Sequence, residues 1–410
     1  MDTYARRFKA SREVGERMRT QVGIVGAGPA GLLLSHLLHL QGVESVIVEA
    51  RDRNYIEERV RAGVLEQGTV DLLIHAGVGE RMTREGLIHR GIAIRFDGHS
   101  HRLDFGDLTG GKAITVYGQH EVVKDLIAAR LTAGGQIVFE AARVSIHDLD
   151  GNRPRICYED NNGIRCELAC DLIAGCDGGH GICRSSIPEG VLTTYQRDYP
   201  FAWLGILAES IPLSEELIYT HHERGFALFS MRAPTITRLY LQCAPDENIA
   251  EWPDEGIWAE LHARLDEKQG EPRLAEGPIL RKGVTAMRSL VAEPMRYGRL
   301  FLAGDAAHIV PATGAKGLNL AVADVRVLAR AITTYYSTGQ ADLLDRYSDT
   351  CLRRVWKVQR FSLWMTSLLH RFATQTAYDQ RIQRAELEYL VHSRAAAQSL
   401  AENYVGLPLE

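Results

Sequence analysis

The sequence lacks several features that would place it in whole classes of protein. Its 410 residues contain no unbroken apolar run long enough to span a bilayer, and residues 1–17 are too charged to include the apolar core of a signal peptide. We therefore expect a cytoplasmic protein without a membrane partner. The formal charge of -5 leaves no basic surplus, so we expect no nucleic-acid partner either.

Cysteine is scarce, and its spacing does not match a metal site. The seven cysteines form no CxxC pair, and no histidine follows them at zinc-finger spacing. Most of them lie in apolar, strand-like stretches, so we expect buried thiols, no metal and a reducing compartment. The chain also has no internal repeat and no low-complexity tract.

What is present is an ordinary globular composition, with 45% hydrophobic residues, on a chain long enough for two or three domains. Residues 21–50 read as a β-branched run, a glycine turn, an apolar helix and a second β-branched run, which predicts a βαβ unit. The turn has GxGxxG spacing at Gly26, Gly28 and Gly31. Glu49 closes the second strand, where its carboxylate can accept both hydroxyls of an adenosine ribose. Together these residues predict a dinucleotide site with phosphates at the helix N-terminus.

Further along the chain, the pattern predicts helices around 65–76 and from Gln119, with short strands between them. A strand meander is expected over 137–176 and an antiparallel sheet over 200–245. Residues 299–308 read as a strand that leads into a helix, and the last hundred residues are mostly helical.

Two later motifs distinguish a flavin from a nicotinamide. GCDGGH at 175–180 puts Asp177 after a buried strand, and AGDAAH at 303–308 puts Asp305 at a strand end. A second acid at a strand terminus can bind the ribityl hydroxyls of a flavin, which NAD lacks. Each motif alone is typical of an ordinary turn. In this order, and with the glycine loop, they are typical of FAD monooxygenases.

These three motifs resemble those of the single-component aromatic flavoprotein hydroxylases, and the resemblance runs from about Thr20 to Pro408. It is carried by the segments RAGVLEQG (61–68), ELIYTHHERGFAL (216–228), GRLFLAGDAAHIVP (298–311), AKGLNL (315–320) and AENYVGLP (401–408). It implies an α/β fold with a Rossmann-like, glutathione-reductase-like FAD-binding domain, an antiparallel or mixed-sheet substrate domain and a helical C-terminal region. The expected boundaries are 1–17 for an N-terminal extension, 18–198 completed by 285–345 for the FAD-binding domain, 199–284 for the substrate domain and 346–410 for a helical interface region.

The resemblance also implies where a substrate would bind. Ser230, Arg232 and Tyr240 match residues that hold a substrate carboxylate, a task that suits the planar fork of arginine. The loop beside the substrate hydroxyl matches Pro311, Ala312 and Thr313.

Catalytic roles follow from the same resemblance. Tyr219 and Tyr404 match a tyrosine pair in line with a substrate phenol, and His89 matches the end of that proton path. A phenol becomes a strong nucleophile when it is ionised, so its proton needs a relay to a group that titrates near neutrality. Arg238 matches a residue near the flavin that assists flavin movement and the negative charge of the reduced ring.

The implied cofactor contacts lie on several segments, and a helix expected to begin near Gly314 would direct its dipole at the flavin. Besides the glycines and acids above, the matching flavin contacts are Arg61, Gln119, Lys316, Gly317, Leu318 and Asn319. The matching contacts to NADPH or NADH are Tyr55, Arg59, His180 and Arg288. No second GxGxxG follows a strand, so we expect the nicotinamide to bind transiently, without its own Rossmann domain.

Three positions depart from the family pattern. Ala312 stands where a second proline often follows Pro311, and Gly179 stands where a bulky residue often lies beside His180. The loop after Glu49 lacks its usual leading arginine, which leaves the choice between NADPH and NADH open.

The resemblance implies FAD-dependent hydroxylation of 4-hydroxybenzoate to 3,4-dihydroxybenzoate, with O2 and NAD(P)H, through a flavin hydroperoxide. The Trp-containing C-terminal helices make a homodimer the expected assembly. One alternative is a related hydroxylase of another hydroxy- or aminobenzoate, because Ala312 alters the loop near the ring. Another is a flavin protein that senses an aromatic ligand without turning it over. The tyrosine pair and His89 argue against a sensor, because binding alone needs no proton relay.

Overall fold

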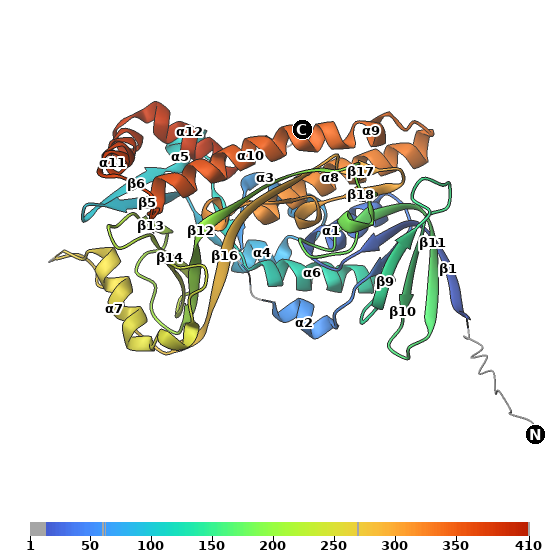
Figure 1. Cartoon of the computed structure of the whole chain (residues 1–410), viewed down its shortest axis with the longest axis horizontal. Coiled ribbons are helices and arrows are strands. Elements are labelled where there is room, and N and C mark those ends of the chain that lie inside the picture. Colours follow the sequence, from blue (N-terminus) through green and yellow to red (C-terminus); the bar gives the residue numbers. More distant parts are fainter. Residues whose placement is uncertain (1–13, 60, 62, 269, 409–410) are drawn as a thin grey trace, which may run out of the picture.

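The predicted βαβ unit forms the centre of the first of two large sheets (Figure 1). The computed structural model describes residues 14–59, 61, 63–268 and 270–408. In the first sheet, β1 pairs in parallel with β2 on one side and with β11 on the other, and β8 and β18 extend the two edges. Its eight strands are β1 (Val14–Val25), β2 (Ser45–Val48), β8 (Gln136–Val138), β9 (Ala142–His147), β10 (Arg155–Glu159), β11 (Arg165–Gly175), β17 (Arg296–Tyr297) and β18 (Leu300–Leu302).

The first strand is longer than the sequence predicts. It begins at Val14 and pairs with β11 from Arg165 onward, so residues 14–17 belong to the sheet. Residues 14–17 of the expected N-terminal extension over 1–17 thus continue the strand ladder. Residues 1–13 lie outside the described part of the chain.

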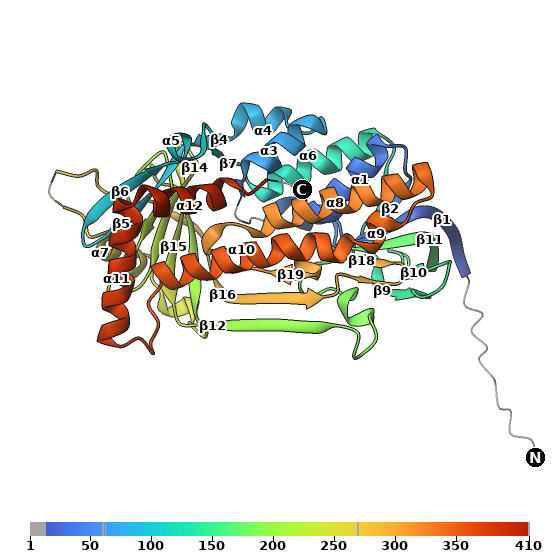
Figure 2. The same cartoon turned by 90° about the horizontal axis from the view of Figure 1, so that it is seen from above.

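The second sheet has the order β19-β16-β12-β15-β14-β13-β5-β6. Its two longest strands, β12 and β16, pair antiparallel from Thr193 opposite Glu293 to Ala208 opposite Ile279, and they run along the molecule in Figure 2. The eight strands are β5 (Gly91–Phe96), β6 (His99–Asp104), β12 (Thr193–Ala208), β13 (Ile218–Thr220), β14 (Ala227–Ala233), β15 (Ile236–Cys243), β16 (Ile279–Glu293) and β19 (His308–Ile309).

One predicted boundary differs from this topology. Residues 91–104 were expected in the FAD-binding domain, but β5 pairs in parallel with β13 and so joins the second sheet. Ile92 and Ile94 alternate on β5 and are both buried in the core of that sheet, which gives the strand its apolar partner there.

Helices pack around the two large sheets (Figure 1), and a small third sheet has the strand order β3-β7-β4. Its strands are β3 (Val64–Leu65), β4 (Leu87–His89) and β7 (Ile114–Val116). The helices are α1 (Pro29–Leu40), α2 (Arg53–Glu58), α3 (Gln67–His75), α4 (Glu80–Glu85), α5 (Phe105–Thr109), α6 (Gln119–Thr132), α7 (Asp254–Leu265), α8 (Gly317–Thr338), α9 (Asp342–Asp345), α10 (Tyr347–Leu369), α11 (Ala377–His392) and α12 (Arg394–Val405). No helix among the described residues is long and apolar enough to cross a bilayer.

The segment from 299 to 317 departs from the expected strand-to-helix form. After β18 come a 3-10 turn (Gly304–Ala306), the short strand β19 and a second 3-10 turn (Ala312–Gly314). The helix predicted near Gly314 begins at Gly317, because Ala315 takes a left-handed backbone with φ of 52° that breaks the helical path. The expected thiols are confirmed, since none of the seven cysteines is in a disulfide and five are buried.

Candidate active site

The glycine loop between β1 and α1 is shaped by close backbone contacts. Gly26 has φ of +106°, and a Cβ there would lie 2.5 Å from the carbonyl oxygen of Cys176. A Cβ on Gly31 would lie 2.0 Å from the Gly26 carbonyl oxygen, so only glycine permits this helix to pack on the turn. Gly28, by contrast, is the N-cap of α1 and meets no protein atom within 4 Å. The loop therefore leaves space at the helix N-terminus, where a phosphate would be favoured.

Glu49 lies where the dinucleotide motif requires an acid. Its carboxylate accepts hydrogen bonds from the Ala27 N–H at 2.7 Å and from the Arg51 N–H at 2.8 Å. Each oxygen can accept a further hydrogen bond, because an ionised carboxylate has about four lone-pair directions. The buried carboxylate is thus fixed in orientation by the loop that it serves.

Asp177 follows β11 as predicted, but much of its side chain supports its own loop. Its Oδ2 accepts a hydrogen bond from the Cys183 N–H at 2.8 Å, and a Cβ on Gly181 would collide with this carboxylate. Its Oδ1 is buried and has no hydrogen-bond partner among the described residues. A buried acceptor left in this way is ready to take a donor from a ligand.

Asp305 is half exposed at the 3-10 turn after β18, and Arg61 Nη1 lies 3.8 Å from its Oδ2. Behind this turn is a buried pair that the sequence did not reveal. Asp324 Oδ2 accepts from the Gly304 N–H at 2.9 Å and lies 2.6 Å from His308 Nε2. Burial alone would lower the pKa of His308, but Asp324 outweighs it and raises that pKa. The pair therefore ties the Asp305 turn to α8.

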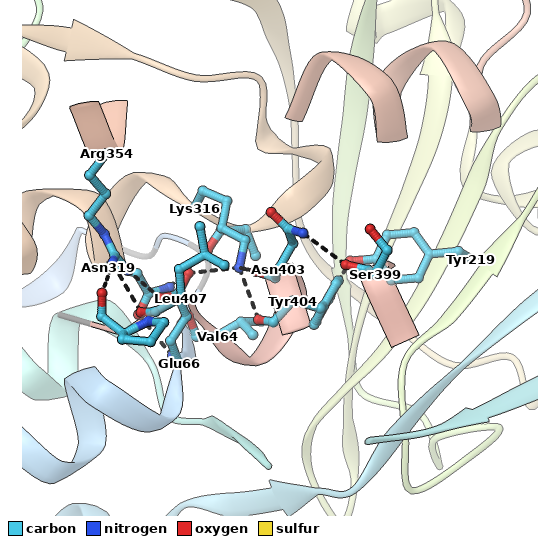
Figure 3. Close-up of polar contacts among 12 residues, drawn as sticks. Val64, Glu66, Tyr219, Lys316, Asn319, Arg354, Ser399, Asn403, Tyr404 and Leu407 are labelled. Atoms are coloured by element: carbon cyan, nitrogen blue, oxygen red, sulfur yellow. Dashed lines mark hydrogen bonds and ion pairs between the residues drawn. The ribbon is translucent and has the colours of Figure 1, made fainter. Parts of the chain in front are cut away.

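Lys316, predicted as a flavin contact, uses its side chain for bonds within the protein. Its ammonium donates to Glu66 Oε1 at 2.7 Å and to the carbonyl oxygens of Asn403 and Tyr404 at 2.6 and 2.9 Å (Figure 3). These bonds use all three of its donors. Burial lowers the pKa of Lys316, and Glu66 opposes that shift. Its side chain thus holds the end of α12.

Asn319, also predicted as a flavin contact, bonds within the protein in the same way. Its side-chain NH2 donates to the carbonyl oxygens of Val64 and Ala315 at 2.8 and 3.0 Å, and its Oδ1 accepts from the Glu66 N–H at 2.8 Å (Figure 3). Gly317 and Leu318 form the first turn of α8 beside it, so this segment presents helix N-terminal backbone N–H groups. Gln119 similarly opens α6.

Two of the predicted carboxylate-binding residues, Ser230 and Tyr240, share one face of the second sheet. Ser230 pairs with Arg238 across β14 and β15, and Tyr240 lies two residues further along β15, on the same face. The guanidinium of Arg238 lies 4.9 Å from the centre of the Tyr240 ring. Gly205 on β12 makes room for them, because a Cβ there would lie 2.7 Å from Arg238 Nη2. This glycine carries no sequence signal of its own.

Arg232 lies two residues after Ser230 on β14, at the register shift between Met231 and Ala233, and it interacts with Tyr240. Its Nη2 donates to the Arg61 carbonyl oxygen at 3.5 Å, whereas its Nε is buried without a hydrogen-bond partner in the part of the chain that the structure describes. Burial lowers the pKa of Arg232, with Tyr240 opposing, yet an arginine stays protonated in proteins. A half-buried guanidinium whose Nε is unpaired favours a carboxylate ligand.

Tyr219 and Tyr404 meet in the interior although 185 residues separate them. Their hydroxyl oxygens are 2.5 Å apart, each residue is 1% exposed, and Tyr219 also donates to the Thr313 carbonyl oxygen at 3.2 Å. Burial and then the neighbouring Tyr404 raise the pKa of Tyr219 well above its usual value, and burial likewise raises the pKa of Tyr404. Both hydroxyls are therefore protonated near neutrality and able to pass a proton along.

His89, the third member of the predicted relay, is fully buried on β4. Neither ring nitrogen has a hydrogen-bond partner among the described residues, so a direct bond to Tyr404 is not formed. Burial lowers the pKa of His89 to about 4, with Glu216 opposing. The imidazole is thus neutral near pH 7 and retains a free acceptor nitrogen.

The residues matched to nicotinamide contacts fall into two pairs. Tyr55 on α2 is exposed, and the guanidinium groups of Arg51 and Arg59 lie 5.2 and 5.7 Å from its ring centre. His180 lies beside Arg288, with 3.2 Å between His180 Nε2 and Arg288 Nη2. No described contact joins the two pairs.

Comparison with known proteins identifies the class of this chain. The family described as FAD binding domain matches residues 19–362. The geometry fits that cofactor, because the open Gly28 loop, Glu49 and the unpaired Oδ1 of Asp177 lie where an FAD would need them. The chain therefore belongs to the FAD-binding-domain family of flavoprotein monooxygenases.

Individual relatives indicate the activity more narrowly than the family does. A p-hydroxybenzoate hydroxylase from Acinetobacter baylyi is 51% identical over 395 residues, which cover 96% of this chain and 97% of that protein. A 3-(3-hydroxy-phenyl)propionate/3-hydroxycinnamic acid hydroxylase from Mycobacterium avium is 27% identical and covers 80% of this chain and 57% of its own length. The solved structure of a p-nitrophenol 4-monooxygenase from Pseudomonas putida shares the fold, with a TM-score of 0.80 at 19% identity, covering 96% of this chain and 100% of that chain. The predicted family, fold class, enzyme class and FAD cofactor are confirmed.

Proposed function

We propose that this enzyme hydroxylates 4-hydroxybenzoate to 3,4-dihydroxybenzoate, consuming O2 and NAD(P)H. The observation that carries this assignment is the buried contact between the Tyr219 and Tyr404 hydroxyls, because a substrate phenol needs such a path for its proton. The 51% identity to a p-hydroxybenzoate hydroxylase over almost the whole of both chains supports the same substrate.

The substrate carboxylate is held, in this proposal, by the polar face of the second sheet. Arg232 supplies the charge and a fork of N–H donors, while Ser230 and Tyr240 supply hydroxyls. Arg238 lies next to Tyr240 and would supply positive potential that stabilises the negative charge of a reduced flavin. The loop of Pro311, Ala312 and Thr313 lies on the Tyr219 side, where the substrate hydroxyl would be.

The tyrosine pair then activates the ring. Tyr219 has one proton and two acceptors, the Thr313 carbonyl and the Tyr404 hydroxyl. When Tyr219 passes its proton to Tyr404 and Tyr404 passes its own proton onward, the Tyr219 oxygen can accept the proton of the substrate phenol. The phenolate that results is a strong nucleophile at the ring carbon ortho to its oxygen. His89, neutral and unpaired, is the proposed end of the path, reached from Tyr404 through an intermediary. Its pKa of about 4 is below the near-neutral value expected from the sequence, because the imidazole is buried.

The cofactor residues provide binding and orientation. FAD, once reduced by the nicotinamide, supplies the activation of O2. The residues proposed to hold it are Gly26, Gly28, Gly31, Glu49, Arg61, Gln119, Asp177 and Asp305, with the backbone of Lys316, Gly317, Leu318 and Asn319. The residues proposed to receive NADPH or NADH are Tyr55, Arg59, His180 and Arg288.

We also propose a cytoplasmic homodimer that binds no nucleic acid. The exposed side chains of Tyr378, Ile382 and Tyr389 follow α11 at spacings that place them near one helix face, and such a patch is typical of an interface. The seven cysteines without a disulfide suit a reducing compartment, and the net charge of -5 disfavours nucleic acid. Sedimentation of the purified protein, compared with a Tyr389→Glu variant, tests the dimer.

Tyr219→Phe tests the central role. We expect product formation to fall about a hundredfold, within the range that a positioned acid or base contributes, while the dissociation constant for 4-hydroxybenzoate changes little. Product should be measured by chromatography beside NAD(P)H consumption, with a panel of hydroxybenzoates and aminobenzoates and with both nicotinamides. Unchanged turnover in Tyr219→Phe would contradict the proton path. Faster turnover of another ring acid by the wild type would show that 4-hydroxybenzoate is not the preferred substrate.

A further inference from the structure

The last turn of α10 touches both walls of the candidate substrate site. α10 runs beside the long strands β12 and β16, and its carboxyl end reaches the part of the second sheet that carries β14 and β15 (Figure 2). Thr366 and His370 lie one helical turn apart at this end, and both are fully buried. Neither residue belongs to any motif that suggested a function.

Thr366 is joined to the loop that faces Tyr219. Its hydroxyl donates to the Ser362 carbonyl oxygen at 2.7 Å, so it must accept the bond from the Thr313 hydroxyl at 2.9 Å. The Thr313 carbonyl is the group that competes with Tyr404 for the Tyr219 proton. Thr366 thus fixes, through Thr313, one of the two acceptors between which the Tyr219 proton is divided.

His370 is joined to the opposite wall. Its Nδ1 lies 3.0 Å from the Thr366 carbonyl oxygen, which can only accept, so Nδ1 carries the proton and Nε2 accepts from the Trp203 indole N–H at 2.7 Å. Burial lowers the pKa of His370 to about 3, which keeps this neutral form over the working range of pH. The bond holds Trp203 in place.

Trp203 in turn packs against substrate-side residues. Its ring centre is 4.9 Å from that of Tyr240 and 5.1 Å from that of Phe226, and Phe226 is 6.1 Å from Tyr219. Phe201 and Phe226 stack on the His370 ring at 4.5 and 4.4 Å. A rotation of His370 would therefore be transmitted to the ring that borders the proposed carboxylate site.

We propose that Thr366 and His370 are positioning residues for the hydroxylation, Thr366 by holding the Thr313 carbonyl at Tyr219 and His370 by holding Trp203 beside Tyr240. This inference rests on the proposed function for its kinetic consequence. Its structural part, the bond between His370 and Trp203, is independent of the substrate. Misplacement of groups at a reacting centre by an ångström can cost up to a hundredfold in rate, so the effect should be measurable.

Thr366→Val removes the hydroxyl and keeps the shape of the side chain. We expect kcat for product formation to fall about tenfold, with KM for 4-hydroxybenzoate within about twofold and a smaller fraction of NAD(P)H oxidation yielding product. Thr366→Ser should restore most of the loss, because it returns the acceptor. Thr350→Val, a matched change nearer the start of the same helix, should leave these constants unchanged. Equal rates for the Val and Ser variants would overturn the role.

His370→Phe keeps a stacked ring and removes the acceptor, whereas His370→Gln returns an acceptor near the Nε2 position. We expect the KM of the Phe variant to be about tenfold higher and the fluorescence emission of Trp203 to shift. The Trp203 emission is the spectrum of the holoenzyme minus the spectrum of the Trp203→Phe holoenzyme. The Gln variant should reverse both changes in part. His392→Phe is the matched control, because His392 also bonds the carbonyl four residues earlier, at the end of α11.

The two proposals fail in different ways. Suppose that the wild-type enzyme does not convert 4-hydroxybenzoate, but the Trp203 emission still shifts in His370→Phe and returns in His370→Gln. The proposed substrate is then wrong, and the KM test is repeated with the ring acid that the enzyme does accept. If the emission is the same in wild type and His370→Phe, or if KM is unchanged, the positioning role of His370 is overturned.

Discussion

The two sides of the candidate site satisfy their buried polar groups differently. On the cofactor side, Glu49, Lys316 and Asn319 are held by bonds within the protein, and Asp177 Oδ1 is the exception. On the substrate side, Arg232 Nε and both nitrogens of His89 lack partners among the described residues. An unpaired buried polar group costs about 1–3 kcal/mol, so the substrate side is less stable until a ligand pairs with it. On the cofactor side most buried polar groups are therefore paired by the protein itself. On the substrate side the unpaired groups need a ligand to pair with them.

The largest effect should come from breaking the backbone geometry of the cofactor side. In Gly31→Ala the new Cβ would lie 2.0 Å from the Gly26 carbonyl oxygen, a backbone contact that no side-chain rotation relieves. We expect loss of bound FAD and of most folded protein, measured by the flavin absorbance and by circular dichroism. Gly28→Ala is the control, because its Cβ meets no protein atom within 4 Å. That variant should keep the fold and lose FAD affinity; equal folding of the two variants would contradict this account.

A smaller effect is expected on the substrate side from Arg232→Gln, which removes the charge that would pair with a carboxylate. We expect KM for 4-hydroxybenzoate to rise about 100- to 1000-fold, corresponding to roughly 3–4 kcal/mol, with FAD content and thermal stability preserved. Steady-state kinetics and flavin absorbance measure these quantities. Arg326→Gln, an exposed arginine on α8, should change neither. A loss of FAD from Arg232→Gln would instead place Arg232 on the cofactor side.

Because His89 is buried, we expect the free energy of unfolding of the protein to depend on pH. The pKa of His89 is about 4 in the folded protein and 6.5 ordinarily, so the unfolded chain binds the proton first as the pH falls. The free energy of unfolding that the neutral imidazole contributes is therefore fully present above pH 6.5 and decreases as the pH falls toward 4. At pH 5 the decrease is about 2 kcal/mol. Urea unfolding at pH 7.5 and pH 5 should show this loss in the wild type and a smaller one in His89→Gln. An identical loss in both would show that His89 is not the group.

The smallest effect is expected at Ala312, where the family pattern has a second proline. Ala312 is exposed and begins a 3-10 turn after the extended Pro311, a position that accepts proline. Ala312→Pro should raise the free energy of unfolding by up to about 1 kcal/mol and leave turnover within about twofold. Urea unfolding and product assays measure both. A change of preferred ring acid would mean that this loop selects the substrate.

Features that depend on local backbone geometry could be predicted from the sequence. The glycine loop and Glu49 belong to one βαβ unit, and their spacing alone predicted the strand, helix and strand of that unit. The antiparallel character of the substrate sheet and the C-terminal helices followed from residue periodicity. The start of α8 was misplaced because a left-handed alanine, Ala315, interrupts a sequence that otherwise reads as helical.

Features that depend on distant partners could not be predicted. The partners of Lys316 lie 250 and 88 residues away, at Glu66 and Tyr404, and nothing near Lys316 indicates them. The same is true of Asp324 with His308 and of His370 with Trp203, because no motif marks any of these four residues. β5 joined the other sheet for a similar reason, because its parallel partner β13 is over a hundred residues later.

The long pairing of β12 with β16 also bears on how this molecule can be divided. One hydrogen-bonded ribbon from Thr193 to Ala208 links strand β19, next to the Asp305 turn, with the sheet that carries Arg232. Any cut that separates these two regions would have to pass through the hydrogen-bonded strands β12 and β16. We expect limited proteolysis to release no independently folded fragment, and exchange of the substrate sheet between relatives to require both strands together.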